Sequence, residues 1–97
     1  MEHRKTLEFN MISLEKTISI AKKEFGQDMK LYEKCQDIEG AYAFSATPKD
    51  GIPITGLVLL VDKETGETSY EQYIPLPGYR LAELTKKGHA IDISKMI

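Results

Sequence analysis

The sequence is poor in the residues that build metal and redox sites: its 97 residues include one cysteine, two histidines and no tryptophan. Cys35 has no partner for an internal disulfide, which agrees with a reducing compartment. A zinc site needs about four histidine, cysteine or carboxylate ligands at compatible spacing, and His3, Cys35 and His89 each stand alone. We therefore expect no metal site and no cofactor.

An excess of charge and a long apolar run are also missing. The chain has 13 basic and 15 acidic residues and a pI near 5.7, which leaves no positive field for a phosphate backbone. The longest apolar run, 56–61, is far shorter than the roughly 20 residues that cross a bilayer. The first residues lack the apolar segment of a signal peptide. Nucleic acid and membrane are not expected partners, and the sequence predicts a cytoplasmic protein.

Motifs of catalysis are absent from the sequence. It contains no Gly-x-Ser-x-Gly nucleophile signature, and its isolated glycines precede no predicted helix, so no phosphate-binding loop is expected. Cys35 alternates with Leu31 and Glu33, and we interpret it as a small buried hydrophobe rather than a thiolate. His89 follows Gly88 just past a helix end, where a polar contact is expected rather than a general base. We expect no enzymatic activity, and a small hydrolase or isomerase is the alternative.

Apolar periodicity predicts a single α+β domain over residues 1–97, with poor order expected only at residues 1–10. An amphipathic helix is predicted over 13–25, beginning at the cap Ser13 and ending at Gly26. Its apolar stripe consists of Met11, Leu14, Ile18, Ala21 and Phe25. This helix has one face to bury.

Four antiparallel strands in a meander follow the helix, and a short helix over 79–87 comes after them. The strands are predicted at 29–36, 41–47, 54–61 and 68–74. The first lies at or near a sheet edge and ends in a turn at 37–40. One of its faces carries Met29, Leu31, Glu33 and Cys35. One face of the second strand carries only small residues, Ala41, Ala43 and Ser45, which leaves room for a helix above them.

The strand 54–61 is apolar on both faces, which predicts an interior strand that is covered on both sides. The helix 13–25, about 20 Å long at 1.5 Å per residue, can cover one face of the sheet. The second face is covered either by the C-terminal helix with the tail 89–97, or by another chain. The latter alternative predicts a homodimer or a protein partner. The tail is apolar enough to pack on the core, as a half-turn or as a short added strand.

Between the last two strands, Asp62-Lys63-Glu64-Thr65-Gly66 forms either a binding loop or a tight turn. A calcium loop needs twelve residues with acids at alternate positions, and this loop is too short. Asp62 can accept hydrogen bonds from amides two or three residues further on, and Gly66 can supply the left-handed residue that resumes the strand. We therefore predict a turn with a left-handed Gly66.

Tyrosine is the main sign of a binding surface. A small core does not need all of the tyrosines present, and tyrosine is favoured at interfaces because it joins an apolar body to a polar tip. We predict that a partner contacts the exposed side of the last strands, with an acidic rim that suits a basic partner such as a nuclease. The predicted contact residues are Tyr70, Gln72, Tyr73, Glu64 and Glu67.

The run Leu57-Val58-Leu59-Leu60-Val61-Asp62-Lys63-Glu64-Thr65-Gly66-Glu67 resembles the apolar strand and Val-Asp-Lys-x-Thr/Ser-Gly-Glu hairpin of the small bacterial YrhB-like proteins. These proteins are grouped with the toxin-immunity proteins of immunity protein family thirty-five. Their N-terminal helix, aromatic strand like Ala41-Tyr42-Ala43-Phe44, hairpin and following helix are similar to most of residues 11–87. The hairpin is also similar to the Val-Asp-x-x-Thr-Gly turn of PepSY domains, which are usually found in exported or membrane-attached proteins.

The resemblance to YrhB-like proteins implies a bacterial protein without enzymatic activity that binds another protein and neutralises a toxin. It transfers no catalytic residue to this chain. The alternative class is a chaperone-like or regulatory small protein that binds several partners.

Overall fold

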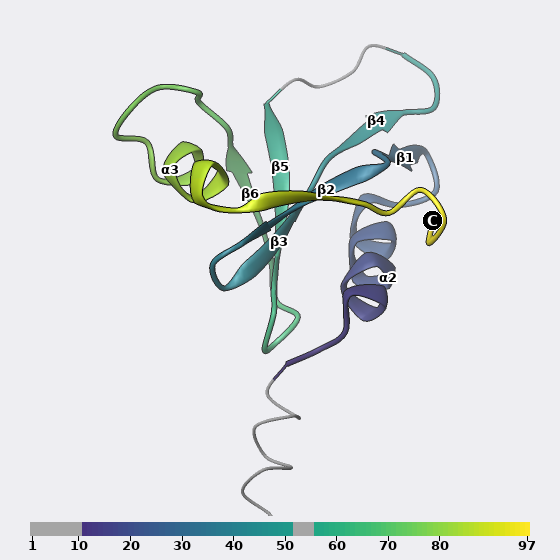
Figure 1. Cartoon of the computed structure of the whole chain (residues 1–97). Helices are drawn as coiled ribbons and strands as arrows, with labels where there is room; N and C mark the ends of the chain where they lie inside the picture. The colour runs from purple at the N-terminus through teal and green to yellow at the C-terminus, as the bar shows by residue number, and fades with distance from the viewer. Residues whose placement is uncertain (1–10, 52–55) are drawn as a thin grey trace, which may run out of the picture.

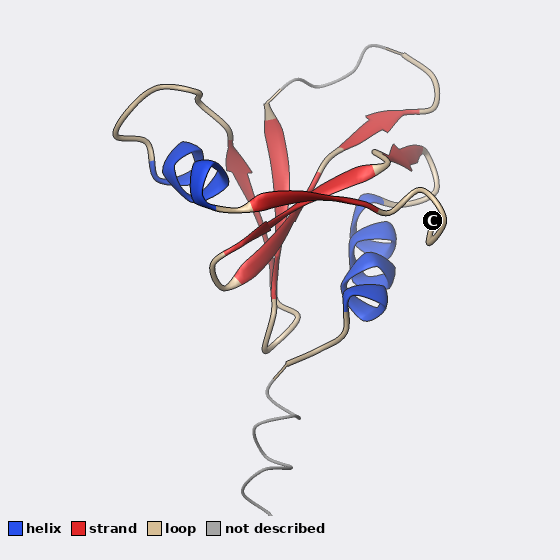
Figure 2. Cartoon of the chain, in the orientation of Figure 1, coloured by secondary structure: helices blue, strands red, loops and turns tan. Residues whose placement is uncertain are grey.

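The computed structural model describes residues 11–51 and 56–97 (Figure 1). Residues 1–10, where poor order is expected, and residues 54–55, where a strand is predicted to begin, lie outside the described residues. Figure 2 shows the helices and strands of the described part. They are α2 (Leu14–Phe25), β1 (Met29–Leu31), β2 (Lys34–Ile38), β3 (Ala41–Phe44), β4 (Ala46–Pro48), β5 (Leu57–Asp62), β6 (Thr68–Gln72), α3 (Arg80–Lys87) and β7 (His89–Asp92).

The main sheet has five antiparallel strands in the order β6-β5-β3-β2-β7, and β1 and β4 form a separate pair. The α+β class is confirmed, and so is the meander β2-β3-β5-β6. The prediction of a four-stranded sheet is wrong, because the tail adds β7 beside β2. Of the two alternatives predicted for the tail, the added strand is the one present; β7 is only four residues long, with Ile91 as its one side chain packed on a core, so its apolar pattern is too short to decide between them.

The N-terminal helix α2 begins and ends where its sequence predicts. The Ser13 hydroxyl oxygen accepts a hydrogen bond from the Lys16 backbone N–H at 3.1 Å, which satisfies one of the free amides of the first turn. The helix turns Thr17, Ile18 and Ala21 toward the sheet, and these side chains are buried. Sequence, cap and packing therefore agree on this element.

The sheet is packed on both faces, by α2 on one side and by α3 on the other (Figure 1). The larger core, under α2, includes Ile18, Ala21, Phe44, Leu59 and Val61. The smaller core, under α3, consists of Ile38, Ala43, Leu60 and Leu81. Because successive side chains of a strand point to opposite faces, β5 supplies Leu59 and Val61 to one core and Leu60 to the other.

The predicted interior position of the apolar strand is confirmed, since β5 lies between β3 and β6. Each fully buried aliphatic side chain contributes roughly 1.5–3 kcal/mol, so either face of β5 would lose much stability if water reached it. α3 of the same chain covers the second face through Leu81 and Leu84. A second chain is therefore not needed to cover this face of the sheet. The homodimer remains a prediction, but the uncovered sheet face no longer supports it.

The long hairpin made by the first strands differs from its prediction. Leu31 pairs with Ala46 and Gln36 pairs with Ala43, so the first arm has two more residues than the second between these pairs. The first arm is therefore divided into β1 and β2, and the second arm into β3 and β4. The turn predicted at 37–40 is also shorter, because β2 continues to Ile38, which is buried in the smaller core.

The extra residues form a bulge after Tyr32, whose N–H donates to the Ser45 carbonyl at 2.8 Å. An unbroken strand would place Glu33 on the same face as Leu31 and Cys35, and both of these side chains are buried. Burying the Glu33 carboxylate without a partner would cost on the order of several kcal/mol. The bulge instead leaves Glu33 exposed to solvent. The bulge therefore follows from one acidic residue in an otherwise apolar face.

The bulge also holds the C-terminal tail. The Ile93 N–H donates to the Glu33 carbonyl at 2.7 Å, and this hydrogen bond extends the pairing of β7 with β2. The Ile93 side chain is 0% exposed and belongs to the larger core. β7 and Ile93 are thus part of the fold.

Replacing Ile93 by alanine should lower the free energy of unfolding by about 2–5 kcal/mol, because it leaves a cavity in the larger core. Met96, which is 39% exposed in the same tail, provides the control, and Met96→Ala should cost less than about 1 kcal/mol. Urea unfolding followed by circular dichroism measures both changes. Equal losses in the two variants would contradict this role of the tail.

Candidate functional site

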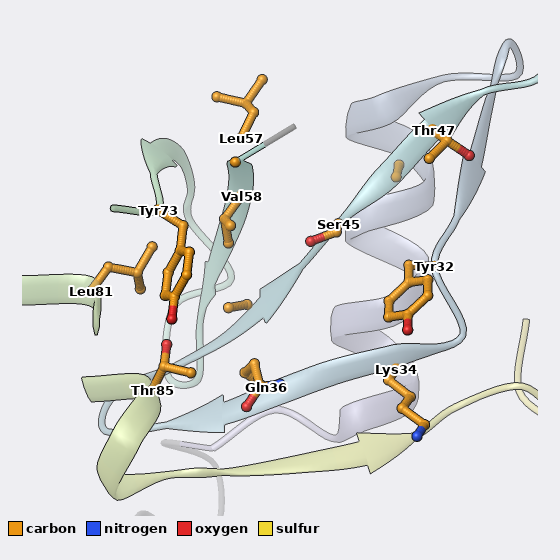
Figure 3. A pocket seen from close by; sticks show the side chains of 13 residues that line it. Tyr32, Lys34, Gln36, Ser45, Thr47, Leu57, Val58, Tyr73, Leu81 and Thr85 are labelled. Carbon is orange, nitrogen blue, oxygen red and sulfur yellow. The ribbon is translucent and has the colours of Figure 1, made fainter. Parts of the chain in front are cut away.

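α3 is too short to cover the whole sheet face on which it packs. It has eight residues, and only Leu81 and Leu84 reach the smaller core. The uncovered part forms a groove of about 510 Å³, which we call the α3-side groove (Figure 3). Its main lining residues are Tyr32, Gln36, Ser45, Val58, Tyr73 and Thr85.

The floor of the groove is made by small and aliphatic side chains of the two central strands. Ala43 and Ser45 come from β3 and its end, and Val58 comes from β5. The small residues predicted to admit a helix do so only in part, because Leu81 packs near Ala43 while Ser45 stays open to the groove. The small side chains therefore explain why this part of the face is hollow.

The two sides of the groove each carry a tyrosine. Figure 3 shows Tyr73 with Leu81 and Thr85 on one side, and Tyr32 with Lys34 on the other. Tyr73 is half-buried against the smaller core, whereas Tyr32, at the bulge, is 56% exposed. The groove thus has a half-buried tyrosine on one side and a solvent-exposed tyrosine on the other.

The chemistry of the lining favours binding through apolar contact and hydrogen bonds. Hydroxyl and amide groups of Gln36, Ser45 and Thr85 surround the apolar floor. Among the described residues that line the groove, Lys34 is the only charged one, and none is Asp, Glu, His or Cys. The groups most often used for general acid–base catalysis are therefore not among the described lining residues.

The structure does not bring the predicted contact residues together on one surface. Tyr70 and Gln72 lie on the α2 face of β6, whereas Tyr73 lies on the opposite face and lines the α3-side groove. Glu64 and Glu67 lie in the exposed turn between β5 and β6. The alternation of side chains along the strand causes this division.

Tyr70 has a partner within the chain. Its ring packs edge-on against Phe25 of α2, with 6.0 Å between ring centroids, and it remains 47% exposed. Partial burial, together with the nearby negative charge of Glu24, raises the pKa of its hydroxyl. Tyr70 therefore helps to seat α2 on the sheet.

Sequence reasoning missed the groove residues Gln36 and Ser45, and it did not place Tyr32 opposite Tyr73. Two signals in the sequence point toward the groove. One is Glu33, whose charge interrupts an apolar face, and the other is the run of small residues that includes Ser45. The distance between the sides depends on how far α3 extends over the sheet, which neither signal determines.

The segment 62–66 forms the predicted turn. The Asp62 carboxylate accepts hydrogen bonds from the backbone N–H groups of Glu64 at 2.8 Å and Thr65 at 2.9 Å. The Gly66 N–H donates to the Asp62 carbonyl at 3.0 Å, and Gly66 has a φ of +78°, as the sequence predicts. The side chain of Asp62 is thus used by the turn itself.

Lys63 joins this turn to two other segments. Its N–H donates to the Gly40 carbonyl at 3.0 Å, and its carbonyl accepts from the Ile12 N–H at 2.8 Å. Its ammonium group forms an ion pair with Asp37 and lies 4.9 Å from the centre of the Tyr42 ring. Lys63 thereby links the two hairpin turns and the segment before α2, which is a structural role.

The one cysteine has no reactive character. Cys35 is buried in the larger core, and this burial, with a smaller effect of the Asp37 charge, raises the pKa of its thiol to about 11. Its thiolate is scarce near neutral pH, which agrees with the interpretation of Cys35 as a core residue.

Known proteins provide no template for this site, because no protein family, curated protein or solved structure matches this chain. In the described part of the chain, no helix is both long enough and apolar enough to cross a membrane. The candidate function therefore rests on the geometry of the α3-side groove and on the resemblance of the hairpin.

The pH dependence of stability should report the Asp62 turn. Hydrogen bonds from the N–H groups of Thr65 and Glu64 hold the pKa of Asp62 below its ordinary value of 3.8. A carboxylate with a lowered pKa stabilises the fold above its unfolded pKa and loses this effect as the pH falls through its folded pKa. Asp62→Asn should therefore be less stable than the native chain near neutral pH, and the two should converge in acid. Urea unfolding of both proteins, near neutral pH and in acid, measures the difference in their free energies of unfolding. A difference that stays constant with pH would contradict the prediction.

A second substitution tests the backbone of the same turn. Gly66→Ala should lose about 1–2 kcal/mol because alanine disfavours positive φ. It should lose more than Gly40→Ala, whose φ is +82°, because an added Cβ at Gly66 would lie 3.0 Å from the Ile20 side chain. A Cβ added at Gly40 would have no atom of the described residues within 4 Å, apart from its own chain neighbours. Thermal unfolding of both variants gives the comparison, and equal losses would show that Ile20 does not restrict the turn.

Proposed function

We propose that this chain is a cytoplasmic protein without enzymatic activity that binds a segment of a partner protein in the α3-side groove. The composition of the groove carries the proposal. It combines an apolar floor at Val58 and Ala43, a tyrosine on each side, and a rim that can form hydrogen bonds. Protein interfaces share this pattern of an apolar centre, enriched aromatic residues and a polar rim.

The resemblance of the 57–67 hairpin to YrhB-like proteins supports a partner of one kind, a bacterial toxin that the chain neutralises. A second observation favours a basic toxin. Glu39, Asp62 and Glu67 line a hollow of about 580 Å³ on the α3 face, at the hairpin end. Arg80 also lines it, but its guanidinium is paired with Glu71 at 2.9 Å. The carboxylates therefore leave a negative field that would steer a basic partner toward this face.

The proposal predicts a toxin-like reading frame beside the gene, and the direct test uses the product of that frame. Mixed with the purified chain, this product should form a complex of fixed stoichiometry in size-exclusion chromatography with light scattering. Co-expression of the chain should restore the growth of cells that produce the toxin-like protein. Weak binding to many unrelated proteins, with suppression of their aggregation, would instead support the chaperone-like alternative.

Filling the groove should weaken this binding. Ser45 lies at the centre of the groove and is only half-buried, so Ser45→Arg places a long side chain over the floor without disturbing either core (Figure 3). We expect the affinity for the toxin-like protein, measured by isothermal titration calorimetry, to fall more than about tenfold. Ser19→Arg, on the exposed side of α2, adds the same charge and should bind like the native chain.

Binding that survives Ser45→Arg, in a variant whose unfolding is unchanged, would contradict the groove as the binding site. A complex that forms with neither variant, although the native chain binds, would indicate an effect of added positive charge rather than of the groove.

A further inference from the structure

A second hollow, of about 560 Å³, lies on the α2 side of the molecule. It is formed where the end of α2, the strand β1 and the last residue, Ile97, meet. Figure 1 shows these three segments beside one another. The rim of the hollow carries Lys22, Lys23, Lys30 and Lys49, and its floor consists of Phe25, Met29, Leu31 and Ile97. We call it the lysine-rimmed hollow.

The four lysines are a local excess of positive charge on a chain whose net charge is −2. Within the described residues, none of the four takes part in a salt bridge, and no carboxylate side chain lines the hollow. The acidic residues nearest in the chain, Glu24, Asp28 and Asp50, are exposed outside its lining. The lining therefore carries four lysines against the single backbone carboxylate of Ile97, which leaves a net positive charge over the hollow.

Helix chemistry accounts for only half of this cluster. Lys22 and Lys23 lie in the last turn of α2, where cations complement the helix dipole. Lys30 comes from β1, and Lys49 follows β4, so neither has a helix end to complement. The hairpin brings these two beside the helix end, since Met29 pairs with Pro48 and the Lys49 N–H donates to the Asp28 carbonyl at 2.8 Å.

The floor of the hollow restricts which anion would fit it. Leu31 is buried, Phe25 and Met29 are half-buried, and Ile97 is 37% exposed. A nucleic acid backbone would use the lysines but would leave this apolar floor uncovered. A peptide segment that carries carboxylates on both sides of one large apolar side chain would satisfy both parts. Methionine in the floor can adapt to the shape of such a side chain.

We propose that the lysine-rimmed hollow binds an acidic segment of a partner protein, with one apolar or aromatic side chain of that segment in the hollow. This site lies on the α2 side and is separate from the α3-side groove. It also has the opposite charge preference to the acidic hairpin end. The chain would therefore have two docking surfaces that select partner segments of different chemistry.

The probe is a fluorescein-labelled synthetic peptide in which glutamates and aspartates flank one central phenylalanine. Fluorescence anisotropy with the full chain measures its affinity. The double variant Lys30→Glu with Lys49→Glu should weaken binding about tenfold, because two exposed attractions become repulsions. The control, Lys86→Glu with Lys87→Glu at the end of α3, changes the net charge equally and should bind like the native chain. Replacing the phenylalanine of the peptide by alanine should also weaken binding about tenfold.

Each alternative gives a distinct result. Equal losses in the two double variants would show that only net charge matters and would overturn the proposal. Undiminished binding of the alanine peptide would exclude a role for the apolar floor. A single-stranded oligonucleotide or laurate that displaces the peptide at lower concentration would assign the hollow to another class of anion. None of these results bears on the α3-side groove, because none of the substituted lysines lines it.

Discussion

The fold depends on one constraint, that β5 is apolar on both faces and needs cover on both. Leu59 and Val61 require one layer above the sheet and Leu60 requires another below it. The chain meets this requirement with two helices that lie on either side of the meander in sequence. α2 precedes the sheet and α3 follows β6, so each helix can reach a different face without crossing the other. The three-layer arrangement in Figure 1 is the result.

The surface features follow from the unequal lengths of these helices. α2, with twelve residues, is long enough for the larger core, whereas α3, with eight, leaves part of its sheet face open. The bulge at Glu33 bends the hairpin beside this open part, and together they make the α3-side groove. On the other side, the bent hairpin meets the end of α2 at the lysine-rimmed hollow. One irregularity in the sheet thus contributes to both candidate surfaces.

Strong local signals made much of the fold predictable. The cap at Ser13 and the turn at Asp62 and Gly66 depend on contacts within a few residues, and the apolar strand is recognised from its own composition; each is present in the structure. The break in the first strand depends on where Glu33 would lie in a folded sheet, so a local pattern of alternation did not reveal it. The sequence predicts a half-turn or an added strand for the tail and does not decide between them, because the pairing of β7 with β2 joins distant parts of the chain. Three of the predicted contact residues, Tyr70, Gln72 and Tyr73, were drawn from one predicted strand, although neighbouring residues of a strand face opposite sides of a sheet.

The position of Ile93 also determines the order in which the protein can fold during synthesis. α2 is made before the residues that cover its apolar stripe, which come from β5 and from Ile93 later in the chain. The hydrogen bond from the Ile12 N–H to the Lys63 carbonyl likewise cannot form until Lys63 has been made. Such contacts between distant residues form slowly, because a long loop must close before they stabilise anything. The nascent chain therefore exposes the apolar face of α2 until β5 and Ile93 have both been made.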